Sequence, residues 1–468
     1  MKLTTIILKN YRCYQDLTID LHPQTTVLVA NNGQGKTTIL DAIRVALWPY
    51  VSQFDLSRTG YAEPANTITI DDVRIIRSST SAVYAAVGLT DEMIRLIPAS
   101  VKAIGDYGDG ETIWERFRDS EASKSQAKDD KTCRELKYFA KQLQQDIRNL
   151  ESPPITLPVF GYYGTGRLWK EKRLTESKKG RNSNDKNIRT FAYRDCLDPA
   201  SSYRQFEEWF SNAYKKVLEY QLQQVQQGAK TIEVDPILET PVKVVQDAVN
   251  EVLKPVGWKY LHFSQRDNAL VLRHDEYGVI KAEQLSDGIK NILAMVADIA
   301  YRCVLLNSHL GKDAAKKSGG IIMIDEVDMH LHPRWQQTVV ESLQSAFPKI
   351  QFILTTHSSQ VLTTVPSQCI RIISDGEVHA APKGSKGAES SRLLKRILGV
   401  DSRPQDDENT QLLQAYEKLV YADNWNTDEA RQKREKLDDI YSGEEPKLTE
   451  LDLYIENRNW ELDVEENQ

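Results

Sequence analysis

The sequence predicts an α/β protein. A mixed β-sheet with flanking helices forms a head, which is interrupted by a mainly helical insertion and followed by a helical C-terminal tail. Continuous apolar runs at 26–30, 320–324 and 351–355 lie near both ends of the chain, as expected for strands buried on both faces of a sheet. The first two runs lead through a polar turn into a helical pattern. The residues between the two ends, and those after them, are charged and mostly show helical spacing of their apolar side chains.

The chain of 468 residues is longer than one hydrophobic core usually organises, which indicates two or three lobes. Its composition is typical of a soluble globular protein, and no apolar run approaches the ~20 residues of a membrane helix. The start reads as an alternating strand and lacks the features of a signal peptide. Five scattered cysteines without a Cys-x-x-Cys pair argue against a disulfide framework and a zinc site. We therefore expect a cytoplasmic protein with reduced thiols and no membrane contact.

The first predicted part, residues 1–105, is the N-terminal half of the head. Strand-like stretches at 3–8 and 17–21 precede the first apolar run, which leads into a helix at 38–47. Alternating segments between about 68 and 87 predict an antiparallel addition to the same sheet.

The second predicted part, residues 106–275, is the insertion. Residues 106–149 are charged and helical in pattern, and the strand-like run 155–160 is expected to return to the head sheet. A basic stretch at 170–189 predicts an exposed loop. Two helices and a strand pair are expected to complete this part, at 203–226, 241–253, 260–265 and 270–274.

The third predicted part, residues 276–385, is the C-terminal half of the head, with helices at 287–306 and 334–346 beside the two later apolar runs. The fourth, residues 386–468, is the helical tail. Its apolar residues near 412–420 have the spacing of a core. Those from Leu448 to Trp460 are interleaved with acids, so they fit a docking surface for a partner as well as a core.

A glycine-rich turn, 30–38 (ANNGQGKTT), joins the first buried strand to a helix. Glycines at such a turn let backbone N–H groups curl around phosphates, and the helix N-terminus adds positive potential. Lys36 is expected to reach the β- and γ-phosphates of ATP, and Thr37 to hold Mg²⁺. The usual pattern has glycine where Ala30 stands, and the same turn also fits an ordinary helix cap. The residues expected to bind nucleotide are Asn32, Gly33, Gln34, Gly35, Lys36, Thr37 and Thr38.

Two carboxylates, Asp325 and Glu326, end the second apolar strand. Asp325 suits a contact to Mg²⁺, and Glu326 suits activation of the attacking water. After the third apolar strand, His357 stands where an imidazole can sense a γ-phosphate, although a lone histidine is usually structural. His330 and His332 lack a third ligand at a sensible spacing, so the sequence does not support a metal site there.

A further motif, 284–290 (QLSDGIK), opens a helix. Its Ser286 and Gly288 offer a hydroxyl and backbone N–H groups to an anion. The same residues also fit an ordinary N-cap.

In their order along the chain, which is the phosphate loop, the motif 284–290, the acidic pair and His357, these four motifs resemble the ABC-type ATPases of the RecF, SMC and Rad-type branch. The resemblance covers both ends of the chain, and it implies an ATP site that a second copy completes head to head. It places the family's signature at 285–288 with Asp287 in place of a glycine, and it places Asp328 in the segment that crosses to the partner. Arg12 matches the basic residue that precedes the phosphate loop near the nucleotide. The glutamine loop has only a weak candidate, Gln53.

Three segments also resemble the PtuA family, the ATPase subunits of Septu anti-phage systems: 162–169 (YYGTGRLW), 325–333 (DEVDMHLHP) and 396–404 (RILGVDSRP). That resemblance implies an ATPase that assembles with itself and with a PtuB-like HNH nuclease, and that controls cleavage of invading nucleic acid.

Other functions remain open at this stage. A RecF-like repair or recombination ATPase has the same motifs. The basic loop at 170–189 fits either a nucleic-acid contact or a solvated loop, because the net charge of −7 gives no global attraction to nucleic acid. A nuclease site within the chain is disfavoured, because the acidic residues 406–408 lie in a polar loop. A transporter subunit fits poorly with so large and charged an insertion.

Overall fold

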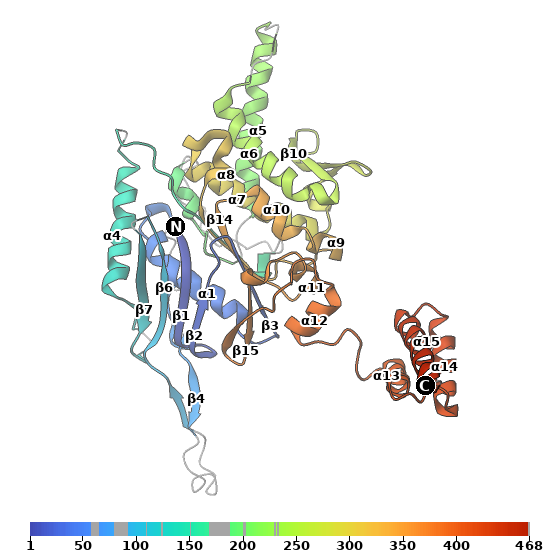
Figure 1. Ribbon diagram of the computed structural model, residues 1–468. Helices are drawn as coiled ribbons and strands as arrows, with labels where there is room; N and C mark the ends of the chain where they lie inside the picture. Colours follow the sequence, from blue (N-terminus) through green and yellow to red (C-terminus); the bar gives the residue numbers. More distant parts are fainter. Residues whose placement is uncertain are drawn as a thin grey trace. The chain divides into compact units, whose positions relative to one another are not determined.

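The computed structural model describes residues 1–466 apart from 58–64, 79–91, 109, 123–124, 150, 168–187, 200–202, 229–230 and 232–233. Most of the basic loop predicted at 170–189, and the last two residues of the motif 162–169, therefore lie outside the described residues. The chain divides into two compact units, Met1–Leu393 and Leu394–Gln468 (Figure 1). Among the described residues, none of the helices combines the length and the apolar composition that a membrane crossing requires.

The central sheet of the first unit collects strands from both ends of the chain. Its six strands lie in the order β16-β15-β3-β14-β13-β9. All neighbours are parallel except β15 and β16. Strands β3, β13, β14 and β9 are buried along their whole length, which explains their continuous apolar runs. The strands are β3 Thr25–Ala30, β9 Val159–Tyr163, β13 Gly320–Ile324, β14 Ile350–Thr355, β15 Ile370–Ser374 and β16 Glu377–Ala380.

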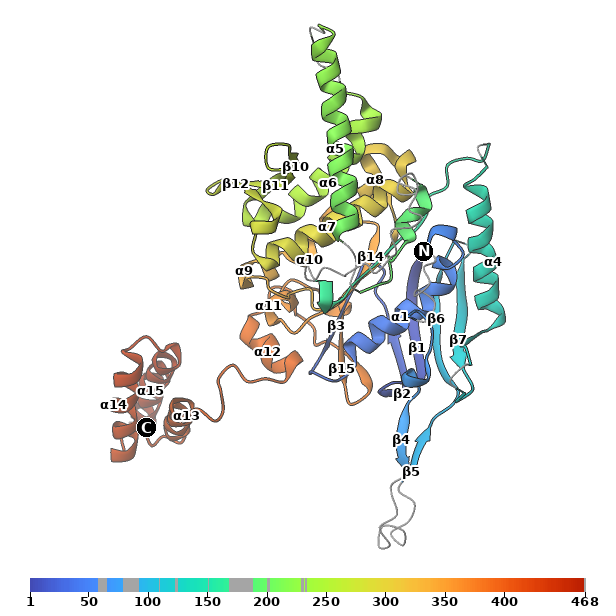
Figure 2. The same ribbon diagram turned by 180° about the vertical axis from the view of Figure 1, so that it is seen from behind.

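A second, antiparallel sheet has the order β2-β1-β6-β7-β8. Helix α1 (Lys36–Val51) packs against strands of both sheets, and Figure 2 shows it beside β1, β6 and β7. Twelve of its 16 residues are buried, because a helix between two sheets has little exposed face. Trp114 of β7 donates its indole N–H to the carbonyl of Ala46 in α1 at 2.9 Å. The strands are β1 Lys2–Tyr11, β2 Tyr14–Asp20, β6 Ala99–Asp106, β7 Glu111–Arg118 and β8 Lys128–Asp129.

Two expectations for this sheet are wrong. Residues 106–149 are not helical throughout, because β7 and β8 precede helix α4 (Lys131–Asp146). The inward positions of β7 include the buried Arg116 and Arg118, whose guanidinium groups bond to backbone carbonyls, so the strand has no apolar alternation to recognise. The predicted boundary at 105 consequently falls inside β6, one residue before its end, and separates that strand from its partner β7.

Of the segment from about 68 to 87, the described residues 68–78 meet that sheet at one antiparallel bridge, between Val73 and Tyr11 of β1, and add no strand to it. Residues 79–87 lie outside the described residues. Asp72 accepts hydrogen bonds from the backbone and the hydroxyl of Thr69, both at 2.8 Å, and this capping box turns the chain into a short 3₁₀ helix. Strand β4 (Ile75–Ser78) then pairs with β5 (Glu92–Arg95) in a separate two-stranded ribbon.

The insertion contains two helices, α5 (Tyr203–Gln226) and α6 (Pro236–Leu253), and a small sheet of β10 (Trp258–Ser264), β11 (Ala269–His274) and β12 (Gly278–Lys281). Figure 1 shows α5 extending away from the head. Helix α6 packs against α7 (Asp287–Leu306) and against α10 (Val339–Ala346). The helix predicted at 334–346 is thus two helices, α9 (Pro333–Gln336) and α10.

The C-terminal unit has its own core. Helices α13 (Glu408–Tyr421), α14 (Asp428–Tyr441) and α15 (Pro446–Glu466) bury a shared cluster. Helix α12 (Ser390–Leu398) precedes them. Leu448 and Leu451 belong to that cluster, so they are core residues and not part of a docking surface. Leu453 and Trp460 remain 55% and 71% exposed. The cluster consists of Leu413, Tyr416, Val420, Trp425, Ala430, Leu437, Leu448 and Leu451.

The pairing of β13 with β9 predicts a strict requirement for glycine at position 320. Gly320 has φ 155°, and a Cβ there would lie 1.9 Å from the carbonyl oxygen of Val159. We expect Gly320→Ala to lower the free energy of unfolding by about 3 kcal/mol, because it adds backbone strain to a steric clash. Gly319→Ala is the control, since a Cβ there meets only Lys349 O at 3.6 Å. Equal denaturation midpoints for Gly320→Ala and Gly319→Ala would contradict the requirement for glycine at position 320.

Candidate nucleotide site

Four parallel strands bring the sequence motifs to one edge of the central sheet. Because β3, β9, β13 and β14 run in the same direction, their carboxyl ends lie together. The glycine-rich turn follows β3, Asp325 and Glu326 follow β13, and His357 follows β14. Motifs from the two ends of the chain therefore meet in one place (Figure 1).

The turn after β3 has the geometry of a phosphate loop. Gly33 and Gly35 have φ angles of 81° and 88°, which disfavour a side chain. A Cβ on Gly35 would also lie 2.5 Å from the hydroxyl oxygen of Tyr14, which donates to the carbonyl of Gln34 at 2.7 Å. Ala30, the last residue of β3, has no positive φ, so its position does not need glycine.

Lys36 folds back over this loop. Its Nζ donates to the carbonyl of Ala30 at 2.8 Å, and the side chain is largely buried. Burial lowers the pKa of Lys36, while the negative charges of Asp325, Glu326 and Asp328 act in the opposite direction. A lysine held inside a loop of backbone N–H groups is suited to bind a phosphate.

A hydrogen-bonded bridge joins the two halves of the site. The Thr37 hydroxyl donates to Asp325 Oδ2 at 2.9 Å, and the Thr355 hydroxyl donates to Asp325 Oδ1 at 2.6 Å. Asp325 is 3% exposed. A hydroxyl and a carboxylate are the oxygen ligands that Mg²⁺ prefers, and Mg²⁺ usually completes its shell with phosphate and water. The described part of the chain has no cluster of three or more His, Cys, Asp or Glu that could hold a metal by itself.

Glu326 and His357 lie close to the Thr37–Asp325–Thr355 hydrogen bonds and interact with charged groups there. Glu326 has a φ of 49°, unusual for a residue other than glycine, and its N–H donates to Thr355 Oγ1 at 2.7 Å. Partial burial and the positive charge of Lys36 lower the pKa of His357, while Asp328, Glu326 and Asp325 oppose that shift. His357 is therefore neutral at pH 7.

The predicted signature packs against the segment that follows Glu326. A Cβ on Gly288 would lie 2.3 Å from the carbonyl oxygen of His330, so glycine is required for this close approach. Asp328, in the same segment, accepts a hydrogen bond from the Thr356 hydroxyl. Ser286 is exposed at the N-terminus of α7, where its side chain makes no capping hydrogen bond. The structure thus presents Ser286 on the surface.

Arg12 is held by two carboxylates. Its Nε lies 2.8 Å from Asp72 and its Nη1 lies 2.6 Å from Asp41 of α1. Asp41 also lies 3.4 Å from the hydroxyl of Tyr162 in β9. Asp41 and Tyr162 were not predicted from the sequence. The available signal was an acid one turn after Thr37, in a helix that is mostly apolar beyond its first turn.

Two further positions do not belong to this site. Gln53 lies beyond the end of α1 and donates to the carbonyl of Pro49 and to Ser52 Oγ. Because α1 has 16 residues, Gln53 is about 24 Å along the helix from the phosphate loop, so this weak candidate for the glutamine loop lies far from the phosphate loop of its own chain. His332 caps α9, since its Nδ1 accepts from the backbone of Arg334 at 3.3 Å.

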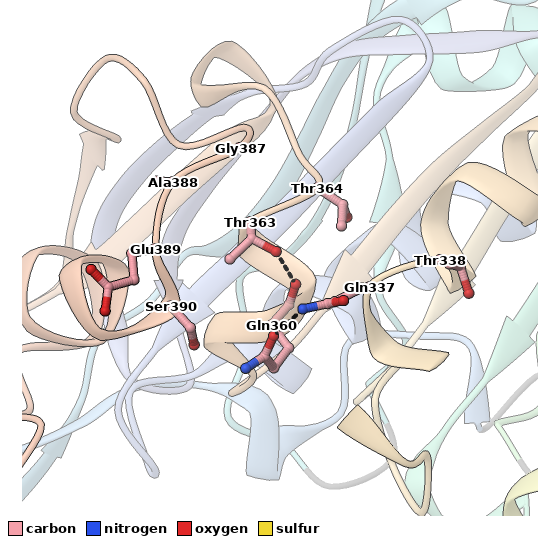
Figure 3. Close-up of a pocket in the computed structure, with 9 residues that line it drawn as sticks. All are labelled: Gln337, Thr338, Gln360, Thr363, Thr364, Gly387, Ala388, Glu389 and Ser390. Carbon is pink, nitrogen blue, oxygen red and sulfur yellow. Dashed lines mark hydrogen bonds between the residues drawn. The ribbon is translucent and has the colours of Figure 1, made fainter. Parts of the chain in front are cut away.

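A separate pocket lies beside α11 (Ser359–Leu362), which follows His357 closely (Figure 3). Gln337 donates to Gln360 Oε1 at 2.6 Å across it. Among the described residues that line it, Glu389 alone is charged, and its negative charge does not suit a triphosphate. The lining residues are Gln337, Thr338, Gln360, Thr363, Thr364, Gly387, Ala388, Glu389 and Ser390.

A phosphate loop, an acidic pair after a buried strand and a switch histidine at one sheet edge define a class, the ABC-type ATPases. The chain belongs to the family described as "AAA ATPase domain", whose model matches residues 1–362.

Comparison with the sequences of known proteins agrees with this assignment. The chain is 30% identical to a "Retron Ec83 probable ATPase" of Escherichia coli, over all of this chain and 89% of that protein. It is 46% identical over 98 residues to "Septu protein PtuA" of Bacillus mycoides, which covers 21% of this chain and 12% of that protein. A crystal structure of an "SmcHead bound to the C-winged helix domain of ScpA" aligns with 81% of this chain and 98% of its own, at 12% identity and a TM-score of 0.44.

The lowered pKa of His357 predicts a pH-dependent contribution to stability. Its pKa in the unfolded chain is about 6.5, and the folded value lies below this. The unfolded chain therefore binds the proton first, and stability is lost as the pH falls from about 6.5 through the folded value. Chemical denaturation at pH 7, 6 and 5 should show a steeper loss for the wild type than for His357→Gln. The exposed His379, changed to Gln, is the control. If the free energy of unfolding falls with pH equally for the wild type and for His357→Gln, this contribution of His357 is ruled out.

Proposed function

We propose that the chain hydrolyses ATP at a site shared between two copies of itself. The bridge Thr37–Asp325–Thr355 carries this proposal, because it aligns a magnesium-type ligand pair with the phosphate loop and with Glu326. ATP phosphates lie in the loop 32–38 with Lys36 on the γ-phosphate, and Arg12 lies near the nucleotide. Thr37 and Asp325 hold Mg²⁺, which neutralises phosphate charge when bound. Glu326 accepts the proton of the attacking water, and His357 contacts the γ-phosphate.

The second copy supplies the signature. Ser286 and Gly288 of one chain face the γ-phosphate that Lys36 of the other chain holds, and Asp328 lies beside this contact. The exposure of Ser286 at a helix N-terminus supports the arrangement, since such a terminus attracts anions. Asp287 replaces a glycine and adds a negative charge there, with Lys290 Nζ 3.8 Å away. We therefore expect weaker engagement than a neutral signature gives.

Replacement of Glu326 by Gln should trap the engaged pair. The amide cannot accept the proton from water, so ATP stays bound between the two copies. Light scattering should show ATP-dependent self-association of Glu326→Gln at micromolar protein, and adding Ser286→Arg to the same chain should abolish it. Self-association that is unchanged by ATP, or that survives Ser286→Arg, would contradict the shared site.

For the biological role, we propose an ATPase subunit of an anti-phage system that controls a PtuB-like HNH nuclease acting on invading nucleic acid. The relationship to a retron ATPase and to PtuA supports this role. A RecF-like repair ATPase is the second candidate, because 43 residues are 49% identical to the "DNA replication and repair protein RecF" of Staphylococcus epidermidis. A neighbouring HNH gene favours the first role, and a neighbouring recombination gene favours the second.

The C-terminal unit is suited to dock the nuclease. Residues 394–468 contain ten Lys and Arg against twenty Asp and Glu, a net charge of −10, whereas the rest of the chain carries +3. On α15, Leu453 and Trp460 are seven residues apart, so they lie on one helix face, and both are exposed. Exposed Glu456 lies on the helix between them. A basic protein with an apolar groove fits this surface, because exposed tryptophans are frequent interface anchors.

Loss of this anchor should weaken nuclease binding. We expect Trp460→Ala to raise the Kd for the neighbouring HNH protein about 10-fold or more, with ATP hydrolysis unchanged. Tyr138→Ala is the matched control, since Tyr138 is 66% exposed on α4 in the other unit. Calorimetric titration of purified full-length proteins provides the measurement. Equal affinities for the two variants would show that the nuclease binds elsewhere.

A further inference from the structure

A buried ion pair lies in the helix that begins with the signature. Asp298 and Arg302 of α7 are 2% and 3% exposed, and Arg302 Nε lies 2.8 Å from Asp298 Oδ2. Withdrawing two charges from water offsets most of their attraction, so such a pair is a weak stabiliser compared with apolar packing. Because the hydrogen bonds of such an ion pair require a defined geometry, the pair is better suited to holding the neighbouring side chains and backbone in one conformation.

Tyr163 connects this pair to the nucleotide site. Its hydroxyl donates to Asp298 Oδ2 at 2.8 Å, and its backbone carbonyl accepts from the N–H of Asp325 at 2.8 Å. Tyr163 is the last residue of β9, beside β13, and is 3% exposed. A single buried residue therefore touches both the signature helix and the residue that bonds to Thr37.

Arg302 also reaches the segment between β9 and α5. Its Nη1 donates to the carbonyls of Ala192 and Arg194. The same segment accepts the Tyr162 N–H at Cys196 O and the Gly164 N–H at Pro199 O, both at 2.9 Å. The ion pair is thus bonded both to the last residue of β9 and to the segment that hydrogen-bonds to that strand.

We propose that Asp298, Arg302 and Tyr163 are positioning residues that couple the position of α7 to the Asp325–Glu326 pair of the same chain. This inference rests on the proposed function, in which the start of α7 grips the nucleotide of the second copy. A small shift of α7 moves Asp298, and Tyr163 follows because its hydroxyl bonds to that carboxylate. The carbonyl of Tyr163 then carries the shift to Asp325. Engagement with the second copy consequently sets the geometry for hydrolysis in the first.

Tyr163→Phe tests the coupling, because it removes one hydroxyl and keeps the ring and the backbone bond to Asp325. We expect kcat for ATP to fall about 10-fold with KM within about twofold of the wild type, the pattern of a lost interaction that acts in the transition state. Tyr193→Phe is the matched control. Tyr193 is also buried near β9 and its hydroxyl donates to the carbonyl of Pro158 at 2.8 Å, but it bonds to neither α7 nor Asp325.

Equal kcat values for Tyr163→Phe and Tyr193→Phe would overturn the coupling. If a thermal unfolding measurement shows that Tyr163→Phe does not fold, Asp298→Asn is used instead. It should show the same fall in kcat with little change in KM. A wild-type kcat in a folded Asp298→Asn chain would also overturn the coupling. Failure of the proposed function is distinguishable, because the wild type itself would then hydrolyse no ATP, or Glu326→Gln would show no ATP-dependent self-association.

Discussion

The hydrogen bond between the Thr37 hydroxyl and Asp325 is the contact on which the rest of the structure depends. It joins residues 288 positions apart in the chain. Forming it requires β3 and β13 to run parallel in one sheet with β14 between them, where Thr355 holds the other carboxylate oxygen. It also requires the insertion to leave the head and return to it, which β9 does by pairing with β13. The closing of this long loop costs conformational entropy, and the buried apolar strands of the central sheet offset it.

The contacts that hold the nucleotide site together also indicate which parts of the chain can vary and take on other functions. Residues at the carboxyl edge are fixed by one another: glycine is required at 35 by Tyr14 and at 288 by His330. The C-terminal unit is compact by itself, and the ribbon β4–β5 pairs with no other strand among the described residues. A head of this kind accepts insertions and appended units without disturbing ATP chemistry. The large acidic excess of the C-terminal unit is consistent with a role in recognition.

The sequence was sufficient to predict an element where its pattern of apolar residues matches the burial of that element in the fold. Strand β13 and helix α7 begin and end at the predicted residues, because a continuous apolar run and a helical period are strong local signals. It failed where tertiary contacts override composition. Arg116 and Arg118 bury their guanidinium groups in a strand, and Leu448 and Leu451 pack inside an acidic helix bundle. The link from Asp298 to Tyr163 spans 135 residues, and no local pattern announces it.

The central claim is that two chains complete each ATP site. Mixing two inactive variants tests it most directly: Lys36→Ala lacks the phosphate-binding lysine, and Ser286→Arg blocks the signature. Each variant alone should hydrolyse no ATP. In an equal mixture, half of the pairs contain one chain of each kind and hold one intact site, so hydrolysis should recover to about a quarter of the wild-type rate. A mixture as inactive as its components, or an active Ser286→Arg chain on its own, would contradict the shared site.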